Sequence, residues 1–385
     1  MTEEGGISNI AVVVSAMGGK PKVTDLLLDS VDAASNRNDS MVNDKLGFIL
    51  EKHFNCLDAL PIDPEKAQIL KEKIENDIGQ IRDILKTVAL MKWKAERISE
   101  LVSGYGETWS AQILSALLSA RSADRQRAAS ASATMNESGT IAHYWRYLDA
   151  RRVITVDEDA IKDGAVCWDI SSEKLNQMNK EEQDTIFKNL SDEEVDRSMI
   201  HFVITGYVAS NTHGVATTLQ RDGSDYSAAI MGRLLKSTNI TIWTDVDGVL
   251  SADPRRVPDS YVLPEVSFNE AMELAYFGAK VIHPKTVSYI ASSCKRQLKI
   301  NYPGCIIILT LLSIVETTKI CRCNLQLWAT HKYLFTSETH STVLFEDQEF
   351  SHRARRIPIE SAVSVVSVRL KIWQLLMLKV VVWLV

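Results

Sequence analysis

Short runs of β-branched residues alternate along this chain with longer helical patterns, and this alternation limits the possible folds more than any other feature. Strands and helices that alternate in sequence favour a mainly parallel sheet with helices on both faces. We therefore expect an α/β fold in which buried strands are connected through helices. The expected strands are Ile10–Ala16, Val153–Val156, His201–Thr205 and Ile240–Trp243.

The helical patterns have clear beginnings. A glycine pair, Gly18-Gly19, follows the first strand, and a helix is expected to start at Thr24-Asp25. Between Glu65 and Met91, apolar residues recur every three or four positions, which predicts a long amphipathic helix with one buried face. A further helix is expected over Glu107–Leu118, opened by a turn at Gly104-Tyr105-Gly106.

A set of polar residues points to a site that handles anions. Arg221 stands four residues before Asp225, with Gly223-Ser224 between them at the expected start of a helix. Free backbone N–H groups at a helix start favour anions. The strand Ile240–Trp243 is followed directly by Thr244-Asp245. In open α/β sheets, ligands bind at the carboxyl ends of strands, so this pattern predicts a phosphate-handling site.

Charge and cysteine content exclude several classes of protein. The net charge of −6 predicts no basic surface, so we expect no nucleic-acid partner. Six cysteines without paired C-x-x-C spacing favour neither a disulfide scaffold nor a structural zinc site. His201, His213 and His283 lack partners at metal-ligand spacing, so we expect no metal bound by the protein itself.

Membrane and targeting signals are not expected either. The apolar runs Cys305–Val315 and Leu370–Val385 are too short or too interrupted to span a bilayer, so we expect no membrane partner. The start, Met1–Gly6, is short and acidic and has no secretory or transit signal.

Five motifs occur in order along the chain: VVVSAMGG…VTDLL at 12–27, SGYGETWSAQILSALL at 103–118, RDGSDYSAAIMG at 221–232, TIWTDVDGVLSADPRRV at 241–257 and FGAKVIHPKT at 277–286. Together they resemble aspartate kinase, and most closely the kinase half of the plant and bacterial bifunctional aspartokinase–homoserine dehydrogenases. The similarity covers most of residues 10–290 and implies the amino-acid-kinase fold, a three-layer α/β/α sandwich.

The resemblance implies an activity, ATP-dependent phosphorylation of L-aspartate to 4-phospho-L-aspartate, the first step towards lysine, threonine and methionine. It implies ATP and Mg²⁺, with the metal held mainly by the nucleotide, and a homo-oligomer. Lys280 and Asp225 are the implied catalytic residues. The implied aspartate site consists of Ser15, Thr24, Glu107, Arg221, Ser224 and Asp225. The implied ATP site consists of Thr244, Asp245, Leu250, Asp253, Arg255 and Lys280.

The resemblance also sets expected boundaries. The kinase domain is expected over residues 7–290, with an insertion near 125–144 that we interpret as a disordered surface loop. Residues 291–385 have no recognisable fold, and we interpret them as an out-of-frame translation of the linker and regulatory ACT region. The opening Lys-Phe-Gly-Gly-Thr-Ser strand of the family does not occur here, so we expect a chain truncated at its N-terminus with weak or no activity. Plant relatives imply a plastid location, and bacterial relatives a cytoplasmic one.

Other interpretations of the same residues stay open. The chain could be another kinase of this fold, acting on a glutamate derivative or a nucleotide, or a non-catalytic subunit that docks on complete relatives. Arg221 and Asp225 could be an ordinary surface pair, and Glu107 a helix-start carboxylate that complements the dipole. Thr24 is an N-cap candidate, and Asp253-Pro254 a turn signal.

Overall fold

The chain divides into two compact units, residues 1–311 with 375–385, and residues 312–374; every element below belongs to the first unit. The computed structural model describes residues 9–92, 96–132, 141–157, 166–188, 190–196, 198–219, 223–237, 239–243, 249–253, 257–263, 265–276, 297–302, 305–310 and 380–384.

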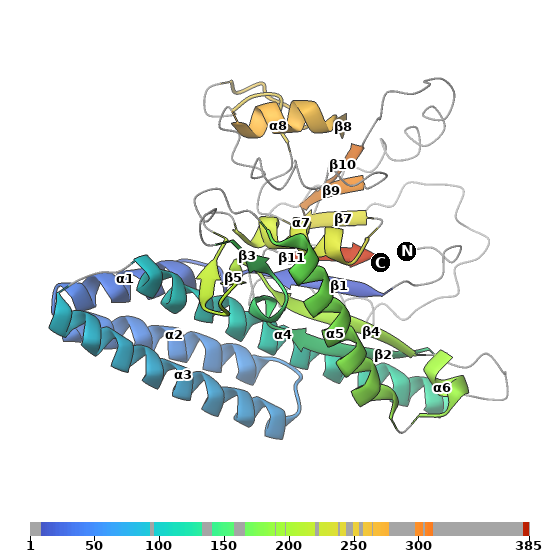
Figure 1. Ribbon diagram of the computed structural model, residues 1–385, viewed down its shortest axis with the longest axis horizontal. Helices are drawn as coiled ribbons and strands as arrows, with labels where there is room; N and C mark the ends of the chain where they lie inside the picture. Colours follow the sequence, from blue (N-terminus) through green and yellow to red (C-terminus); the bar gives the residue numbers. More distant parts are fainter. Residues whose placement is uncertain are drawn as a thin grey trace, which may run out of the picture. The chain divides into compact units, whose positions relative to one another are not determined.

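Four long helices form one side of this unit (Figure 1). They are α1 Val23–Ser35, α2 Asp39–Ala59, α3 Pro64–Met91 and α4 Glu96–Ser132. The predicted amphipathic helix is confirmed as α3, which starts at an Asp63 N-cap followed by Pro64, a residue favoured at the first helical position. Its apolar stripe is buried at Ile74, Ile78, Ile81, Leu85 and Val88.

An eight-stranded sheet lies beside the helices, in the order β2-β4-β1-β11-β7-β9-β10-β8. Among these described strands, four neighbouring pairs are parallel and three are antiparallel. Strands β1, β4 and β7 confirm three of the predicted strands. The strands are β1 Ile10–Val14, β2 Ala142–Leu148, β4 Ser198–Thr205, β7 Asn239–Trp243, β8 Glu265–Val266, β9 Gln297–Tyr302, β10 Cys305–Thr310 and β11 Val380–Leu384.

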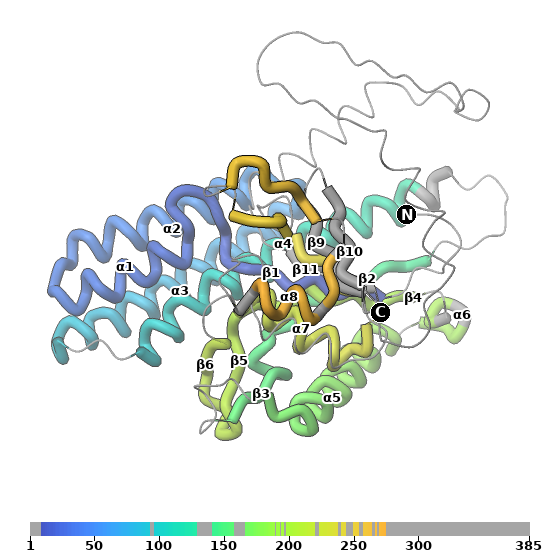
Figure 2. Tube along the Cα trace, turned by 90° about the horizontal axis from the view of Figure 1, so that it is seen from above, coloured from blue at the N-terminus to red at the C-terminus, as the bar shows by residue number. Residues whose placement is uncertain are grey.

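Helices cover both faces of the sheet, which gives three layers. Helices α5 Trp168–Phe187 and α7 Gly223–Leu234 share a core cluster with Ala11 and Val13 of β1. Because side chains alternate along a strand, the buried Val12 and Val14 face the other way. That face is covered by α4, which packs against β1, β2 and β4. Figure 2 shows α4 and α5 on opposite sides of these strands.

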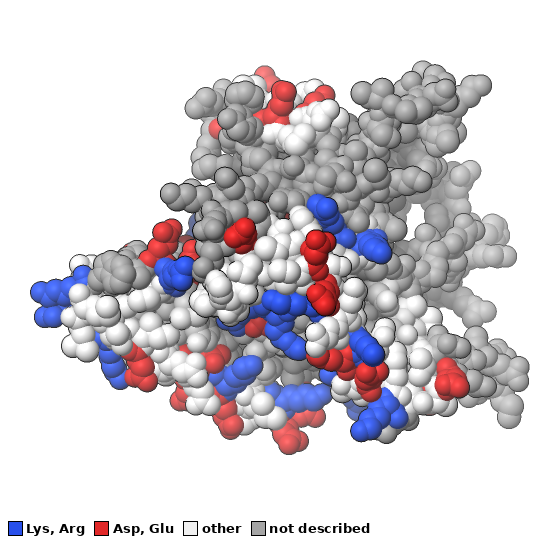
Figure 3. Space-filling model, viewed as in Figure 1, with Lys and Arg blue, Asp and Glu red and all other residues white. Residues whose placement is uncertain are grey.

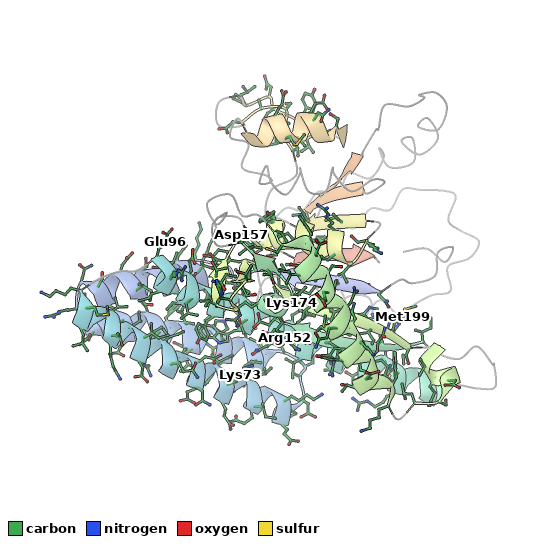
Figure 4. All side chains as sticks on the ribbon, viewed as in Figure 1. Lys73, Glu96, Arg152, Asp157, Lys174 and Met199 are labelled. Carbon is green, nitrogen blue, oxygen red and sulfur yellow. The ribbon has the colours of Figure 1, made fainter. Side chains whose placement is uncertain are left out.

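A smaller sheet of three strands, ordered β3-β5-β6, adjoins this core. Its strands are β3 Thr155–Val156, β5 Val208–Asn211 and β6 Ala216–Thr218. Lys174 reaches from α5 towards this sheet (Figure 4), and its Nζ donates to Thr155 Oγ1 at 2.8 Å. The remaining short elements are η1 Ala150–Arg152, α6 Asp192–Asp196 and α8 Phe268–Tyr276.

Two expectations about α4 are wrong. The expected turn at Gly104–Gly106 lies inside α4, and residues 125–132 extend the helix where a loop was expected. The glycines serve close packing: a Cβ at Gly104 would lie 2.8 Å from Val208 Cγ1, and one at Gly106 would lie 2.8 Å from Ala16 Cβ. Strand β2 begins at Ala142, also inside the expected loop, and residues 133–140 lie outside the described residues.

Beyond residue 290, the described strands β9, β10 and β11 belong to the main sheet. The interpretation of residues 291–385 as an out-of-frame translation stays a prediction. The other residues of this segment lie outside the described part of the structure. Within the described residues, no helix is long and apolar enough to cross a membrane. Basic and acidic side chains are intermixed over the described part of the face shown in Figure 3.

Candidate functional site

The carboxyl ends of β1 and β4 meet at one edge of the sheet. Ser15 follows β1 directly and is half-buried. Gly206 follows β4, and its backbone N–H donates to the carbonyl of Val14 at 2.8 Å. Ser15 therefore lies where parallel strands end, the place at which α/β folds bind ligands.

The first turn of α7 packs against this edge. A Cβ at Gly206 would lie 2.6 Å from Ser224 Oγ and 2.8 Å from the carbonyl oxygen of Val14. A Cβ at Gly223 would lie 2.8 Å from the Tyr207 ring. Tyr207 has φ 64°, a left-handed conformation that costs a non-glycine residue about 1–2 kcal/mol. The absence of side chains at the two glycines lets the helix start approach the strand ends.

Asp225 is the third residue of α7 and is only 3% exposed. A carboxylate in the first turn is stabilised by the positive end of the helix dipole. This burial excludes the interpretation of Asp225 as part of an ordinary surface pair. Ser224 beside it is half-buried, while Arg221 lies outside the described residues.

Glu107 supplies a second buried carboxyl group, from the middle of α4. Gly106 lets α4 approach Ala16 and Val23, and Glu107 is 4% exposed. Burial raises the pKa of Glu107 to about 8, although a hydrogen bond from the backbone N–H of Ala16 partly opposes the rise. Within the described part of the chain, its Oε2 is buried without a hydrogen-bond partner. Since Glu107 stands well inside α4, its interpretation as a helix-start carboxylate is wrong.

The loop between β1 and α1 is fixed from α2. The Lys52 ammonium donates to the carbonyl oxygens of Gly18 at 2.5 Å and Pro21 at 3.0 Å. Thr24 is the second residue of α1 and is half-buried. The N-cap position is occupied by Lys22, so the interpretation of Thr24 as the N-cap is wrong.

Two polar residues that sequence reasoning missed share a face of α4 with Glu107. Glu100 Oε2 accepts from Thr217 Oγ1 at 3.4 Å, and burial raises the pKa of Glu100. Ser103 Oγ lies 3.3 Å from the Tyr207 hydroxyl. Glu100, Ser103 and Glu107 are spaced i, i+3, i+7, the spacing of residues on one face of a helix. This pattern was missed because the start of the helix was expected at Glu107.

The residues expected to bind ATP are described only in part. Leu250 pairs with Val262 in an isolated antiparallel bridge, and the exposed Asp253 accepts the backbone N–H of Val257 through its carbonyl at 2.9 Å. These bonds join residues 249–253 to residues 257–263. The remaining predicted residues lie outside the described ones: Thr244, Asp245, Arg255 and Lys280.

The described side chains do not form a metal-binding group of their own. In this part of the chain, no three His, Cys, Asp or Glu side chains converge. Glu107, with its raised pKa, is mostly protonated near pH 7 and is a poor ligand for a hard cation. Within the described residues, we therefore assign no side chains to a metal.

Comparison with known proteins gives a consistent result. A model of the amino acid kinase family matches residues 2–299. The chloroplastic bifunctional aspartokinase/homoserine dehydrogenase 2 of Arabidopsis thaliana is 36% identical over 277 residues, which cover 72% of this chain and 26% of that protein. The bifunctional enzyme of Haemophilus influenzae is 54% identical over 85 residues, 22% of this chain and 10% of that protein. The chain thus spans about a quarter of the length of its bifunctional plant relatives.

A solved structure agrees with this result. Aspartokinase III of E. coli in complex with aspartate and ADP, in the R-state, superposes with a TM-score of 0.58 at 23% identity. The match covers 79% of this chain and 58% of that protein. This likeness confirms the expected fold.

Proposed function

This chain belongs to the amino acid kinase family. From that premise we propose that it binds L-aspartate at the carboxyl ends of β1 and β4 and phosphorylates it with ATP. One observation carries the proposal. Two carboxyl groups, Glu107 and Asp225, are buried beside the strand ends, and an oxygen of Glu107 has no partner among the described residues. A buried carboxyl group with an unpartnered oxygen favours a ligand that brings a positive charge.

The α-ammonium group of aspartate supplies that charge. Glu107 and Asp225 take the ammonium, and binding converts Glu107 to its ionised form because a nearby cation lowers the pKa of a carboxyl group. The carboxylates of the ligand need donors instead. The backbone N–H groups at the start of α7 and the Ser224 hydroxyl provide them. We assign Arg221 to a ligand carboxylate as a bidentate partner.

The proposed reaction is a phosphoryl transfer between two anions. An oxygen of the aspartate β-carboxylate attacks the γ-phosphorus of ATP, the bond to the β,γ-bridging oxygen breaks, and ADP leaves. The acceptor is already ionised, so no proton needs to be removed. Catalysis therefore depends on positioning and on cations that reduce the repulsion between donor and acceptor.

We assign the nucleotide to the second half of the sheet. In the sequence, Thr244 and Asp245 follow β7 directly, and Leu250, Asp253 and Arg255 come shortly after them. Lys280 would neutralise phosphate charge. Magnesium, bound to the nucleotide, would supply further charge neutralisation.

A hydroxamate assay tests this proposal. The chain is incubated with ATP, Mg²⁺ and hydroxylamine, which traps an acyl phosphate, with L-aspartate, L-glutamate or UMP as alternative acceptors; ADP release is followed in each arm. We expect hydroxamate and ADP with L-aspartate only, at no more than the weak rate that the sequence predicts. Product with glutamate, or ADP release with UMP alone, would assign a different kinase of the family.

A substitution separates an enzyme from a non-catalytic subunit. We expect Arg221→Ala to abolish binding of aspartate and leave any association between chains unchanged. If the parent chain associates with other chains but binds neither aspartate nor ATP, it is a docking subunit. That result would reject the proposed activity.

A further inference from the structure

The strand nearest the C-terminus lies in the middle of the main sheet. Strand β11 pairs antiparallel with β1, with Ile10 opposite Leu384 and Val14 opposite Val380. It also pairs antiparallel with β7, with Val381 opposite Ile242. Both edges of β11 are therefore used, and β11 is the neighbour of β1 and of β7 in the sheet order.

Without β11, the eight-stranded sheet would divide into two separate sheets, β2-β4-β1 and β7-β9-β10-β8. Strand β1 is deeply buried, with Val13 and Val14 at 0% exposure. Backbone N–H and C=O groups of a buried strand need partners, and leaving them unpaired is costly. The space between β1 and β7 is thus a site that requires a strand.

The sequence of β11 suits this position. Its five residues, VVVWL, are all apolar, and such runs are typical of strands covered on both faces. Four of them are β-branched or aromatic, the residue types enriched in strands.

The position of β11 also bears on the sheet edge that carries the site. Strands β1 and β7 run in the same direction, because each is antiparallel to β11. Their carboxyl ends therefore emerge at one edge, separated by two strand spacings, roughly 10 Å. One end leads to Ser15 and the other to Thr244.

We propose that the space between β1 and β7 is a strand-acceptor site and that its occupant is residues 380–384 of the same chain. The C-terminal strand holds the two halves of the sheet together and sets the distance between their carboxyl ends. This inference concerns the fold and is independent of the proposed function.

Two matched disulfide pairs test the register in the full-length chain. Val12 and Val382 are Cα partners in the ladder, and opposite positions of an antiparallel pair lie within the Cα separation that a disulfide spans, so Val12→Cys with Val382→Cys is the matched pair. Val12→Cys with Val381→Cys is the control, since a shift of one residue directs the side chains to opposite faces. After mild oxidation, peptide mass spectrometry identifies the new bridge among the six native cysteines.

We expect an intramolecular disulfide in the matched pair and far less in the control. A bridge between two copies, equal yields in both pairs, or no bridge would each overturn the proposal. Hydrogen exchange on the unmodified chain gives a second test that needs no substitution. Amides of residues 380–384 should exchange as slowly as those of β1, and exchange at the rate of an unstructured peptide would reject the assignment.

Discussion

Glu107, in the middle of α4, accepts a hydrogen bond from the backbone N–H of Ala16, the residue after Ser15. This contact connects α4 to the end of β1. The other carboxyl oxygen of Glu107, Oε2, is buried without a partner among the described residues. Because the group is 4% exposed, its neutral form is favoured until a cation arrives.

The first prediction concerns the pH dependence of aspartate binding. The pKa of Glu107 is about 8 in the free protein, and an ammonium ligand lowers it, so binding below pH 8 releases a proton. The ionised fraction falls as pH falls, so affinity for aspartate should drop roughly fiftyfold between pH 8 and pH 6. Titration calorimetry in two buffers of different ionisation enthalpy measures both affinity and proton release.

Glu107→Gln is the control for this experiment. It keeps the shape of the side chain but cannot ionise, so its weaker affinity should change little over the same pH range. Equal pH dependence in the parent and the variant would show that Glu107 does not take the ammonium.

A second prediction concerns Gly206. An alanine there places a Cβ 2.8 Å from the backbone carbonyl of Val14 and 2.6 Å from Ser224 Oγ, and a main-chain atom cannot move away easily. We expect Gly206→Ala to lower the free energy of unfolding by about 1–3 kcal/mol, as overpacking does. Chemical denaturation measures this change.

Gly79→Ala is the matched control. Gly79 lies inside α3, and a Cβ there meets nothing within 4 Å. Alanine is the better helix former, so this variant should gain up to about 1 kcal/mol. If both glycine variants shift stability in the same direction, close packing at Gly206 is not the cause.

The third prediction concerns acid stability and two stacked histidines. His201 Nδ1 accepts the backbone N–H of Ile10 at 2.9 Å, so its other nitrogen, Nε2, carries the proton and donates to His143 Nδ1 at 2.8 Å. Burial and the neighbouring His143 lower the pKa of His201 to about 4. The folded pKa lies below the usual value, so this contribution to stability is present above about pH 6.5 and is lost as pH falls towards 4.

We expect protonation of His201 to lower the free energy of unfolding of the parent by on the order of 2 kcal/mol as the pH falls from 6.5 to 4. His201→Asn should unfold with a shallower dependence on pH between 6.5 and 4, whatever its stability at neutral pH. An unchanged slope in His201→Asn would show that His201 is not the cause of this pH dependence. Denaturant midpoints at several pH values decide between these outcomes.

A fourth prediction concerns Lys52. Its two hydrogen bonds to loop carbonyls hold the segment between Ser15 and Thr24, so Lys52→Met should destabilise the chain by about 1 kcal/mol and weaken aspartate binding several-fold. Lys45→Met, on the same helix, removes a surface ion pair with Asp29 and should change neither quantity appreciably. Indistinguishable affinities for the two variants would show that the loop is held without Lys52.

Part of this fold could be predicted from local patterns. The run Ile10–Ala16 and the apolar stripe of residues 65–91 carry their periodicity in the sequence, and they form β1 and α3. Buried strands and amphipathic helices are specified by the residues within them, so no distant partner needs to be known.

Other features depended on distant partners and could not be predicted. Gly104 and Gly106 were interpreted as a turn, because their closeness to Val208 and Ala16 is a tertiary contact. Strand β11 pairs with residues hundreds of positions away, and an apolar run gives no register. For the site, the motif order predicted Glu107 and Asp225 as partners of a ligand, and that role stays a prediction. The role of Lys52 could not be predicted, because its ammonium donates to backbone carbonyls, and any residue type presents those.

The central claim is that Glu107 and Asp225 form a site for L-aspartate, and one calorimetric titration tests it most directly. L-aspartate is titrated into the full-length chain and into Asp225→Asn at pH 8, with folding of both checked by circular dichroism. We predict saturable binding to the parent and binding at least tenfold weaker in the variant, since losing a charged hydrogen-bonding partner costs about 1.5–3 kcal/mol. Equal affinities, or no heat of binding to the folded parent, would contradict the account.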